Sequence, residues 1–358
     1  MTNNNGQNAP QAPAEAEREL HLVCSSGGSR AILASAGVLL AADYAGVKRF
    51  KSIGGVSGGS VPTALFAAGL DAKECVRTAI EIDFSSLLTR KVSYLQILMA
   101  LLWQRRYEKV RPIDGAMTSE KLGEFIDSFS EVWPEGYWTV GIHENFEIIF
   151  NEAGIFKIGP DRLLRVVDGK PGNLGKAVRG SCAVPGVISA VEYDDMHLFD
   201  GALGTEGRCP VSLPTRLYGA KRTDIIACDV GDDTGNTSER ITKLWKLICG
   251  DECVPDITEP DYHTDGQIVL IRPKITAFRT LQFSLTKDQK WQAVMAGFVD
   301  GLPELANAGI LSVDKLKDAS EVTREYQRIL RRATTGKKQK EGFIARETEK
   351  LLVSQGLL

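Results

Sequence analysis

The sequence has few of the residues on which disulfide-bonded and metal-binding proteins depend. Its 358 residues include seven cysteines and four histidines. The cysteines are odd in number and scattered, and most lie in apolar runs such as LHLVCSS and DIIACDV, which indicates reduced thiols in a cytoplasmic protein. The pair in CGDEC, Cys249 and Cys253, has no second pair near it, so a zinc site is not expected. We expect neither a metal nor another cofactor.

Long apolar runs and a strong charge imbalance are also absent. No stretch reaches the roughly 18 consecutive apolar residues of a membrane-spanning helix, so an integral membrane protein is not expected. The 43 basic and 46 acidic residues give a net charge of -3. This balance argues against a nucleic acid polymer as partner. Any contact with a phosphate group or a membrane surface must therefore be local.

The two ends are expected to lie outside the folded domain. Residues 1–18 are polar and rich in Pro, Ala and Asn. They have neither the basic nor the apolar segment of a secretory signal, which predicts a disordered tail. Residues 331–358 combine a run of lysines with an amphipathic pattern, and we interpret them as a basic linker and a peripheral C-terminal helix. The folded domain is then expected over residues 19–330.

Between these ends, short apolar runs alternate with helical patterns. ELHLVCS and RFKSIGGVS are typical of strands, and helical segments follow them, SRAILASAGVLLAADYAG and GSVPTALFAAGL, with Gly46 as the C-terminal stop of the first. This spacing predicts parallel strands joined by right-handed crossovers. The later runs NFEIIFNE, TDIIACDVG and GQIVLIRPK are expected to extend the same sheet. The predicted fold class is α/β, with helices on both faces of a mainly parallel sheet.

Ser57 lies where the second predicted strand meets the helix after it, the position of the serine in a nucleophile elbow. Gly55 and Gly59 stand two residues to either side, where a tight turn leaves no room for a Cβ atom. A helix beginning at Gly58 would direct its free N–H groups and positive dipole end toward the serine oxygen. A Gly-Ser turn in any α/β protein would have the same pattern, so other motifs must decide.

Two further motifs bear on this choice. SSGGSRA, residues 25–31, follows the first strand and opens a helix. Its backbone N–H groups suit a phosphate or the oxyanion of an acyl-transfer intermediate. It is a poor dinucleotide motif, because GxGxxG is absent. Asp200, in MHLFDGALG, ends a short apolar run, where it could cap a helix, form a turn or act as the base for Ser57. Position alone favours the turn.

Together these motifs resemble those of the patatin-like phospholipases, over residues 20–231. In that family GGGxRG supplies an oxyanion hole, GxSGG the nucleophile, and DGG or DGA the aspartate of a Ser-Asp dyad. The matching stretches here are SGGSRA, GVSGG and DGA. The run of small residues in AVRGSCAVPG and the later Pro-Val are also similar. The resemblance implies a patatin-like three-layer α/β/α fold with a mainly parallel central sheet.

The same resemblance implies hydrolysis of fatty-acyl esters of membrane phospholipids, with Ser57 as the nucleophile and Asp200 as the base. The other implied site residues are Gly27, Gly28, Ser29 and Arg30 at the oxyanion hole, Gly55, Gly58 and Gly59 at the elbow, and Gly201 in the aspartate loop. For Arg30 a lipid phosphate and a surface salt bridge are alternatives. Two departures bear on the hole: Ser26 and Ala31 replace its outer glycines, and Arg208 and Cys209 stand where an asparagine is usual.

Two rival functions are considered. A Ser-His-Asp α/β-hydrolase would use Ser57, Asp200 and His263, but its oxyanion loop is expected upstream in an HGGG-like setting. His21, His143 and His197 are interpreted as structural. The second rival is a catalytically silent lipid-binding module on the same fold, which would have lost a dyad member. Both members are present here.

Residues 92–109, VSYLQILMALLWQRRYEK, form a dense apolar run that ends beside Arg105 and Arg106. This pattern fits a buried core helix, or a lid or membrane-contact helix with Trp103 at a headgroup boundary. The second alternative would place a cytoplasmic enzyme in transient contact with the inner face of the membrane. Some bacterial patatin-like enzymes of similar size are activated by a cyclic nucleotide, so the resemblance implies a small-molecule activator as a further partner. No residues here identify its site.

Overall fold

The computed structural model describes residues 18–92, 96, 114–231, 267–335 and 341–358. Several expectations fall outside these residues. They are the tail over residues 1–17, almost all of the apolar run 92–109, the CGDEC cysteines and His263.

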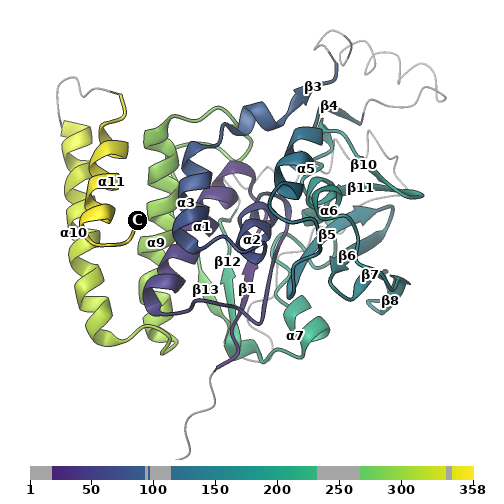
Figure 1. The fold of residues 1–358 in the computed structure, drawn as a ribbon, viewed down its shortest axis with the longest axis horizontal. Helices are drawn as coiled ribbons and strands as arrows, with labels where there is room; N and C mark the ends of the chain where they lie inside the picture. Colours follow the sequence, from purple (N-terminus) through teal and green to yellow (C-terminus); the bar gives the residue numbers. More distant parts are fainter. Residues whose placement is uncertain (1–17, 93–95, 97–113, 232–266, 336–340) are drawn as a thin grey trace, which may run out of the picture.

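Five parallel strands form the centre of the fold (Figure 1). In spatial order they are β13 (Val269–Ile271), β12 (Ile225–Cys228), β1 (His21–Cys24), β2 (Ser52–Gly55) and β5 (Tyr137–His143). Cys24, the last residue of β1, lies opposite Cys228 on one side and Gly55 on the other. The carboxyl ends of these strands are therefore aligned. This arrangement confirms the predicted α/β class.

The sheet continues beyond β5 with antiparallel strands. They are β6 (Phe146–Asn151), β7 (Gly154–Ile158) and β8 (Leu164–Asp168), and β11 (Met196–Asp200) joins β5 beside β10 (Val191–Tyr193). NFEIIFNE thus belongs to the sheet as expected, but runs against its neighbour. Only two residues separate β5 from β6, and a turn that short can join only antiparallel strands. A second sheet contains β3 (Thr89–Arg90), β4 (Gly115–Thr118) and β9 (Gly186–Ile188).

The two faces of the main sheet are covered differently. Leu22 and Cys24 of β1 belong to the larger core, which the helices share, and Val23 faces the opposite side. The helices of the first face are α1 (Gly28–Ala45), α2 (Ser60–Ala67), α3 (Ala72–Glu81), α5 (Glu120–Asp127), α6 (Leu174–Ser181) and α9 (Lys287–Asn307). The second face is packed by the chain around α7 (Leu213–Tyr218). Alternation along each strand therefore separates two apolar cores.

Helix α1 is apolar nearly all round because it is buried between the sheet and α9. Glycines let the two helices approach closely: a Cβ atom at Gly37 would overlap the backbone of Val294, and one at Gly297 would overlap that of Ala34. The helix ends where the sequence predicts, at Gly46, which has a left-handed φ of 104°. None of the described helices is long and apolar enough to cross a membrane.

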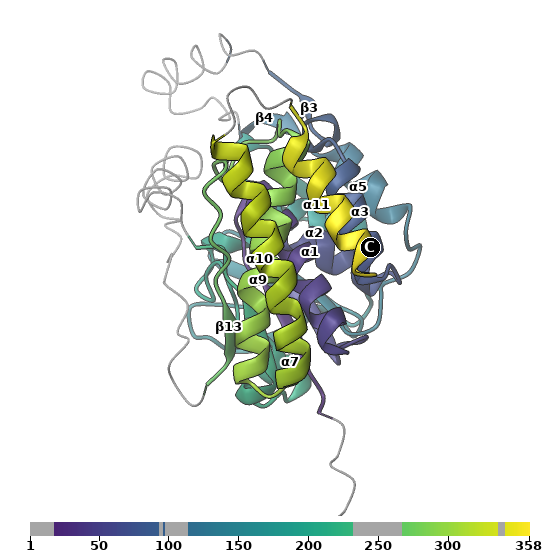
Figure 2. The ribbon, with the colours of Figure 1, turned by 90° about the vertical axis from the view of Figure 1, so that its left-hand side faces the viewer.

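The C-terminal segment differs from the expectation of a basic linker and a peripheral helix. Helix α10 (Val313–Thr335) continues past residue 330, and α11 (Phe343–Ser354) follows. Figure 2 shows both helices lying along α9. Ile344 and Leu352 of α11 belong to the larger core, and the Asp288 carboxylate of α9 accepts hydrogen bonds from the Gly342 and Ala345 N–H groups. The apolar face of α11 thus completes the core, because α9 and α10 alone would leave it open.

We predict that Leu352→Ala destabilises the whole domain. Leu352 is 0% exposed, so its truncation should lower the free energy of unfolding by about 2 to 5 kcal/mol. The neighbouring Val353 is 56% exposed, and Val353→Ala should change it by less than about 0.5 kcal/mol. Urea unfolding followed by circular dichroism measures both. Equal, small effects would show that α11 is only an appendage.

Candidate active site

Ser57 is separated from the end of β2 by Val56 and begins a 3₁₀ turn (Ser57–Gly59) that leads into α2. Its φ of 52° lies in the left-handed region, which is uncommon for a residue with a side chain. Strain of this kind occurs at nucleophile elbows, where a sharp strand-to-helix turn exposes the serine oxygen. The structure therefore places Ser57 in the elbow conformation that the glycine spacing predicts.

The elbow glycines are required by close backbone contacts. A Cβ atom at Gly55 would lie 2.5 Å from the carbonyl carbon of Gly59, and one at Gly59 would lie 2.5 Å from the carbonyl oxygen of Ser25. One at Gly58 would overlap the carbonyl oxygen of Gly28. The elbow is thus packed directly against the glycine loop that follows β1.

That glycine loop opens helix α1. Gly27 and Gly28 have positive φ values of 149° and 55°. The first hydrogen bond of the helix runs from the Ala31 N–H to the Gly27 carbonyl, over 3.4 Å. The N–H groups of Gly28 and Ser29 therefore precede the helical ladder, as is usual in a first turn. They lie beside the elbow at the positive end of the helix dipole, a setting that favours an anion.

The side chains of Ser29 and Arg30 are turned away from the elbow. The Ser29 hydroxyl donates to the Gln282 carbonyl over 2.6 Å. Arg30 is 5% exposed, and its guanidinium donates to the carbonyls of Val230 and Ile275 over 3.3 Å each. The Arg30 side chain is therefore buried and holds the loops after β12 and β13 against α1. A buried side chain in this place does not bind a lipid phosphate or form a surface salt bridge.

Asp200 ends β11 and is 4% exposed. Its carboxylate accepts a hydrogen bond from the Ala202 N–H over 3.0 Å and so caps the 3₁₀ turn Gly201–Leu203. Burial raises the pKa of Asp200 to about 6, although the neighbouring Ser57 hydroxyl and the Ala202 N–H oppose the rise. Gly201 lets the turn lie flat on β5, where a Cβ atom would overlap the Val140 carbonyl.

The Ser57 hydroxyl lies next to the Asp200 carboxylate, and none of the described histidines hydrogen-bonds to either residue. Among the described histidines, His21 contacts Ser52 over 2.7 Å at the opposite end of the strands. His143 and His197 contact each other, because the His197 N–H donates to His143 Nδ1 over 3.2 Å. These contacts are consistent with the interpretation of all three histidines as structural residues. His263 lies outside the residues described.

Two serines that the sequence did not single out hold the backbone of Ser57. The Ser57 N–H donates to the Ser181 hydroxyl of α6 over 2.9 Å, and the Ser60 hydroxyl donates to the Ser57 carbonyl over 2.6 Å. Both serines are fully buried. Ser181 lies in the small-residue run AVRGSCAVPG, but its partner is 124 positions away, so no local pattern could have paired them.

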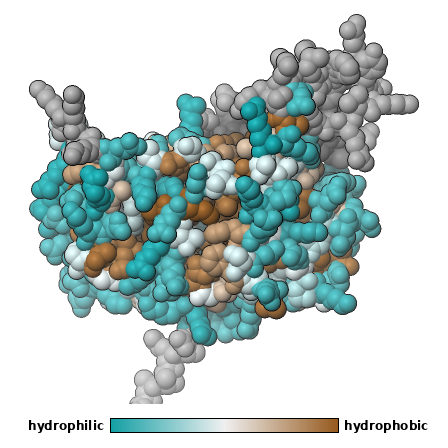
Figure 3. Space-filling model, turned by 45° about the horizontal axis from the view of Figure 1, so that its top comes forward, coloured by the Kyte–Doolittle hydropathy of each residue, from teal (hydrophilic) through white to brown (hydrophobic). Residues whose placement is uncertain are grey.

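An apolar cleft opens beside Ser57. Its walls come from α1, α2, the 3₁₀ turn Phe84–Leu87, α5, the chain around β9 and the segment before α9. The apolar lining residues are Ile32, Val61, Phe84, Leu87, Leu88, Leu122, Val184, Ile188, Leu281 and Phe283. Figure 3 shows hydrophobic residues gathered in the middle of the face that comes forward when the top of Figure 1 is turned toward the viewer. Such a lining suits a hydrocarbon chain rather than a polar ligand.

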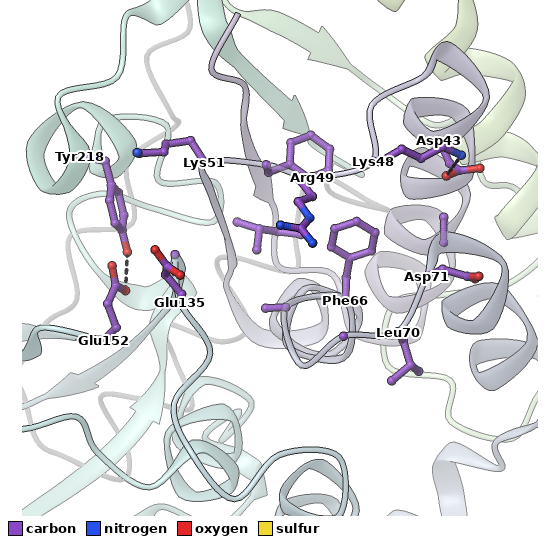
Figure 4. A pocket seen from close by; sticks show the side chains of 16 residues that line it. Asp43, Lys48, Arg49, Lys51, Phe66, Leu70, Asp71, Glu135, Glu152 and Tyr218 are labelled. Atoms are coloured by element: carbon purple, nitrogen blue, oxygen red, sulfur yellow. Dashed lines mark hydrogen bonds and ion pairs between the residues drawn. The ribbon is translucent and has the colours of Figure 1, made fainter. Parts of the chain in front are cut away.

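A larger cavity, of about 630 Å³, opens at the amino ends of β2 and β5 (Figure 4). It contains neither Ser57 nor Asp200. Some of its charged groups have partners within the lining: Lys48 pairs with Asp43 over 2.5 Å, and Glu152 accepts a hydrogen bond from the Tyr218 hydroxyl over 2.9 Å. The smaller apolar cleft is therefore the candidate active site.

Comparison with known proteins identifies the family of the chain. The model of the patatin-like phospholipase family matches residues 22–206, which is more than half of the chain. The chain belongs to this family. No curated protein matches it in a sequence comparison. At the level of the family, this patatin-like protein is a lipid acyl hydrolase.

The solved structures matched in a structural comparison share little sequence with this patatin-like chain. VipD from Legionella pneumophila has 14% identity and a TM-score of 0.46, covering 95% of this chain and 81% of its own. Human GIVD cytosolic phospholipase A2 has 14% identity and a TM-score of 0.40, covering 84% and 59%. The type III effector protein ExoU has 12% identity and a TM-score of 0.39, covering 95% and 70%. The family assignment rests on the sequence match.

We predict that Asp200→Asn stabilises the fold at alkaline pH. The pKa of Asp200 is about 6 in the folded state and about 4 in an unfolded chain, so between these values the folded state binds more protons and stability falls as pH rises. Asparagine avoids the cost of burying a charge and still accepts from Ala202. The variant should gain about 1 to 3 kcal/mol at pH 8 and nothing near pH 4. Urea unfolding across this range measures the difference, and an equal effect at both pH values would contradict it.

Proposed function

We propose that this protein is a phospholipase A-type hydrolase that cleaves fatty-acyl esters of membrane phospholipids with a Ser57-Asp200 dyad. The observation that carries the proposal is that Ser57, in the wall of an apolar cleft, lies next to the buried Asp200 carboxylate. A pKa of about 6 leaves Asp200 ionised at neutral pH, yet close enough to that pH to exchange a proton efficiently.

Acylation begins when Ser57 Oγ attacks the ester carbonyl carbon and its proton passes to Asp200. The carbonyl oxygen becomes an oxyanion, and the donors proposed for it are N–H groups of Gly27, Gly28 and Ser29. When the tetrahedral intermediate collapses, the bond to the alcohol oxygen breaks and Asp200 returns the proton to that oxygen. The products of this half-reaction are a lysophospholipid and an acyl-Ser57 ester.

Deacylation repeats the same steps with water. Asp200 takes a proton from a water molecule, whose oxygen attacks the acyl carbon and forms a second oxyanion in the same place. Collapse releases the fatty acid, and the proton on Asp200 passes to Ser57 Oγ. Each proton that leaves a nucleophile thus reaches a leaving group, and the dyad returns to its starting state.

The apolar lining of the cleft supports a lipid substrate taken from a membrane surface. The acyl chain would lie along the cleft from Ser57 toward Phe84 and Phe283, and the polar headgroup would remain in solvent. Leu281, at the wall of the cleft, is 36% exposed, so the apolar lining reaches the protein surface. Transient binding to the membrane would let an acyl chain enter without crossing water.

Lipid mass spectrometry tests the reaction class. The protein is incubated with vesicles of mixed phospholipids, and free fatty acids and lysophospholipids should appear together in equal amounts. Ser57→Ala serves as the control. Release of a phosphorylated headgroup or of phosphatidic acid in place of fatty acid would exclude an acyl hydrolase.

We predict that Ser57→Ala and Asp200→Asn each abolish ester hydrolysis while the fold remains intact. Each should lower kcat by a factor on the order of 10⁴ to 10⁶, and the double variant should be little worse than either, because nucleophile and base act as a unit. A soluble fluorogenic ester measures the rates, and a fluorophosphonate probe should label the wild type but not Ser57→Ala. In the wild type kcat/KM should fall below pH about 6, as Asp200 becomes protonated.

The control for this prediction is His197→Ala, because His197 lies on the same strand as Asp200 and contacts neither dyad residue in the structure. It should keep nearly wild-type kcat. A large loss in His197→Ala together with a mild loss in Asp200→Asn would contradict the dyad.

A further inference from the structure

Glu147 is a buried carboxylate on an otherwise apolar face of the sheet. It lies on β6, is 3% exposed, and shares its face with Ile149 and with Ile158 of β7. Removing a carboxylate from water is costly unless hydrogen-bond donors replace the water. The groups that donate hydrogen bonds to the Glu147 carboxylate therefore indicate the role of this side chain.

Two hydrogen-bond partners of Glu147 lie in the loop that follows Asp200. Its Oε1 atom accepts from the Glu206 N–H over 2.6 Å and from the Thr205 hydroxyl over 3.2 Å. Gly204 lies directly against the carboxylate, where a Cβ atom would overlap Oε1. The carboxylate thus holds the turn formed by residues 204–206.

The other end of this loop is attached to the same hairpin. Asp200 pairs with Gly141 of β5, and the next residue of β5, Ile142, pairs with Glu147 of β6. The loop of residues 200–206 is therefore attached to the β5–β6 hairpin at both ends. Its first residue, Asp200, pairs with β5, and its last residues are bound by the Glu147 side chain of β6. Between these attachments Gly201 rests on β5 and the Asp200 carboxylate lies next to the Ser57 hydroxyl.

We propose that Glu147 is a positioning residue that keeps the aspartate loop closed on the sheet and so keeps Asp200 buried beside Ser57. It does not touch the reacting atoms, and its role rests on the proposed function of the dyad. Burial is the main reason why the pKa of Asp200 is raised. A loop released at residues 204–206 would admit water to Asp200, and the pKa of Asp200 would then fall toward its ordinary value.

The charges around Glu147 fit this role. Burial raises the pKa of Glu147 to about 7, and the Glu206 carboxylate of the same loop adds to the rise. Arg216 of α7 opposes it and is itself paired with Glu206 over 3.1 Å. An ionised carboxylate accepts hydrogen bonds more strongly than its acid form, so the attachment is firmest above pH about 7.

The test compares Glu147→Ala with a matched variant on the same strand, Asn151→Ala. Asn151 is also buried, and its Oδ1 atom accepts from the N–H groups of Ala153 and Gly154, so it holds the β6–β7 turn instead of the aspartate loop. Glu147→Gln keeps an acceptor oxygen and serves as the conservative rescue. All are assayed on a short soluble ester from pH 4.5 to 9, at a temperature at which circular dichroism shows each variant to be folded.

Glu147→Ala should lower kcat by roughly 10- to 100-fold with little change in KM, because the base is misplaced and not the substrate. The acid limb of its pH–rate profile should have a midpoint at least about half a pH unit below that of the wild type, because water that reaches Asp200 lowers the pKa of this carboxyl group. Asn151→Ala should lower the Tm but leave the limb in place and kcat within about twofold. Glu147→Gln should recover most of the lost rate.

If Glu147→Ala lowers Tm and kcat no more than Asn151→Ala does, and its acid limb does not move, Glu147 only supports the fold and the inference is wrong. Ser57→Ala and Asp200→Asn, assayed in parallel, separate this outcome from a failure of the proposed function. If both of those are inactive, the dyad stands whatever Glu147 does. If either retains activity, the dyad itself fails.

Discussion

The candidate active site depends on the close approach of two turns, the elbow at Ser57–Gly59 and the glycine loop at Gly27 and Gly28. Gly58 of the elbow lies against the backbone of Gly28, and Gly59 lies against the last residues of β1. This contact needs β1 and β2 to be parallel neighbours whose carboxyl ends are level, as the pairing of Cys24 with Gly55 makes them. Any Cβ atom at these glycines would push the proposed oxyanion donors away from the serine. The burial of α1 beneath α9 keeps the first turn in place from behind.

The aspartate loop is joined to the glycine loop at Ser26 and Arg208, two of the positions where this chain departs from the family pattern. The Ser26 N–H donates to the Arg208 carbonyl over 2.8 Å. The Arg208 guanidinium makes two hydrogen bonds, of 3.0 and 3.2 Å, to Asp229, which is fully buried at the end of β12. A buried charge that loses its partner is strongly destabilising, so this pair restrains both loops. Arg208 thus connects the aspartate loop to the glycine loop through one backbone hydrogen bond, from the Ser26 N–H to the Arg208 carbonyl.

The local parts of the site could be predicted, because local sterics and periodicity specify them. Alternation of apolar runs and helical patterns located β1, α1, β2 and α2, and the glycine spacing located the elbow. The contacts between distant residues could not be predicted. Ser181 and Glu147 meet partners 124 and 59 positions away, and nothing in their own neighbourhoods marks them. The burial of Arg30 and of α11 depends in the same way on segments that fold against them from elsewhere in the chain.

The replacement of the outer glycines in the glycine motif leaves the proposed chemistry intact, because backbone groups supply it. Ser26 contributes its N–H to Arg208 whatever its side chain is. Ala31 is fully buried in the first turn of α1, where its methyl group belongs to the larger core and its N–H already bonds to the Gly27 carbonyl. Gly27 and Gly28 are different, since their positive φ values and their contacts with Val230 and Thr280 exclude a side chain. The motif therefore requires glycine at its centre, where the backbone must turn, and tolerates small residues at its ends.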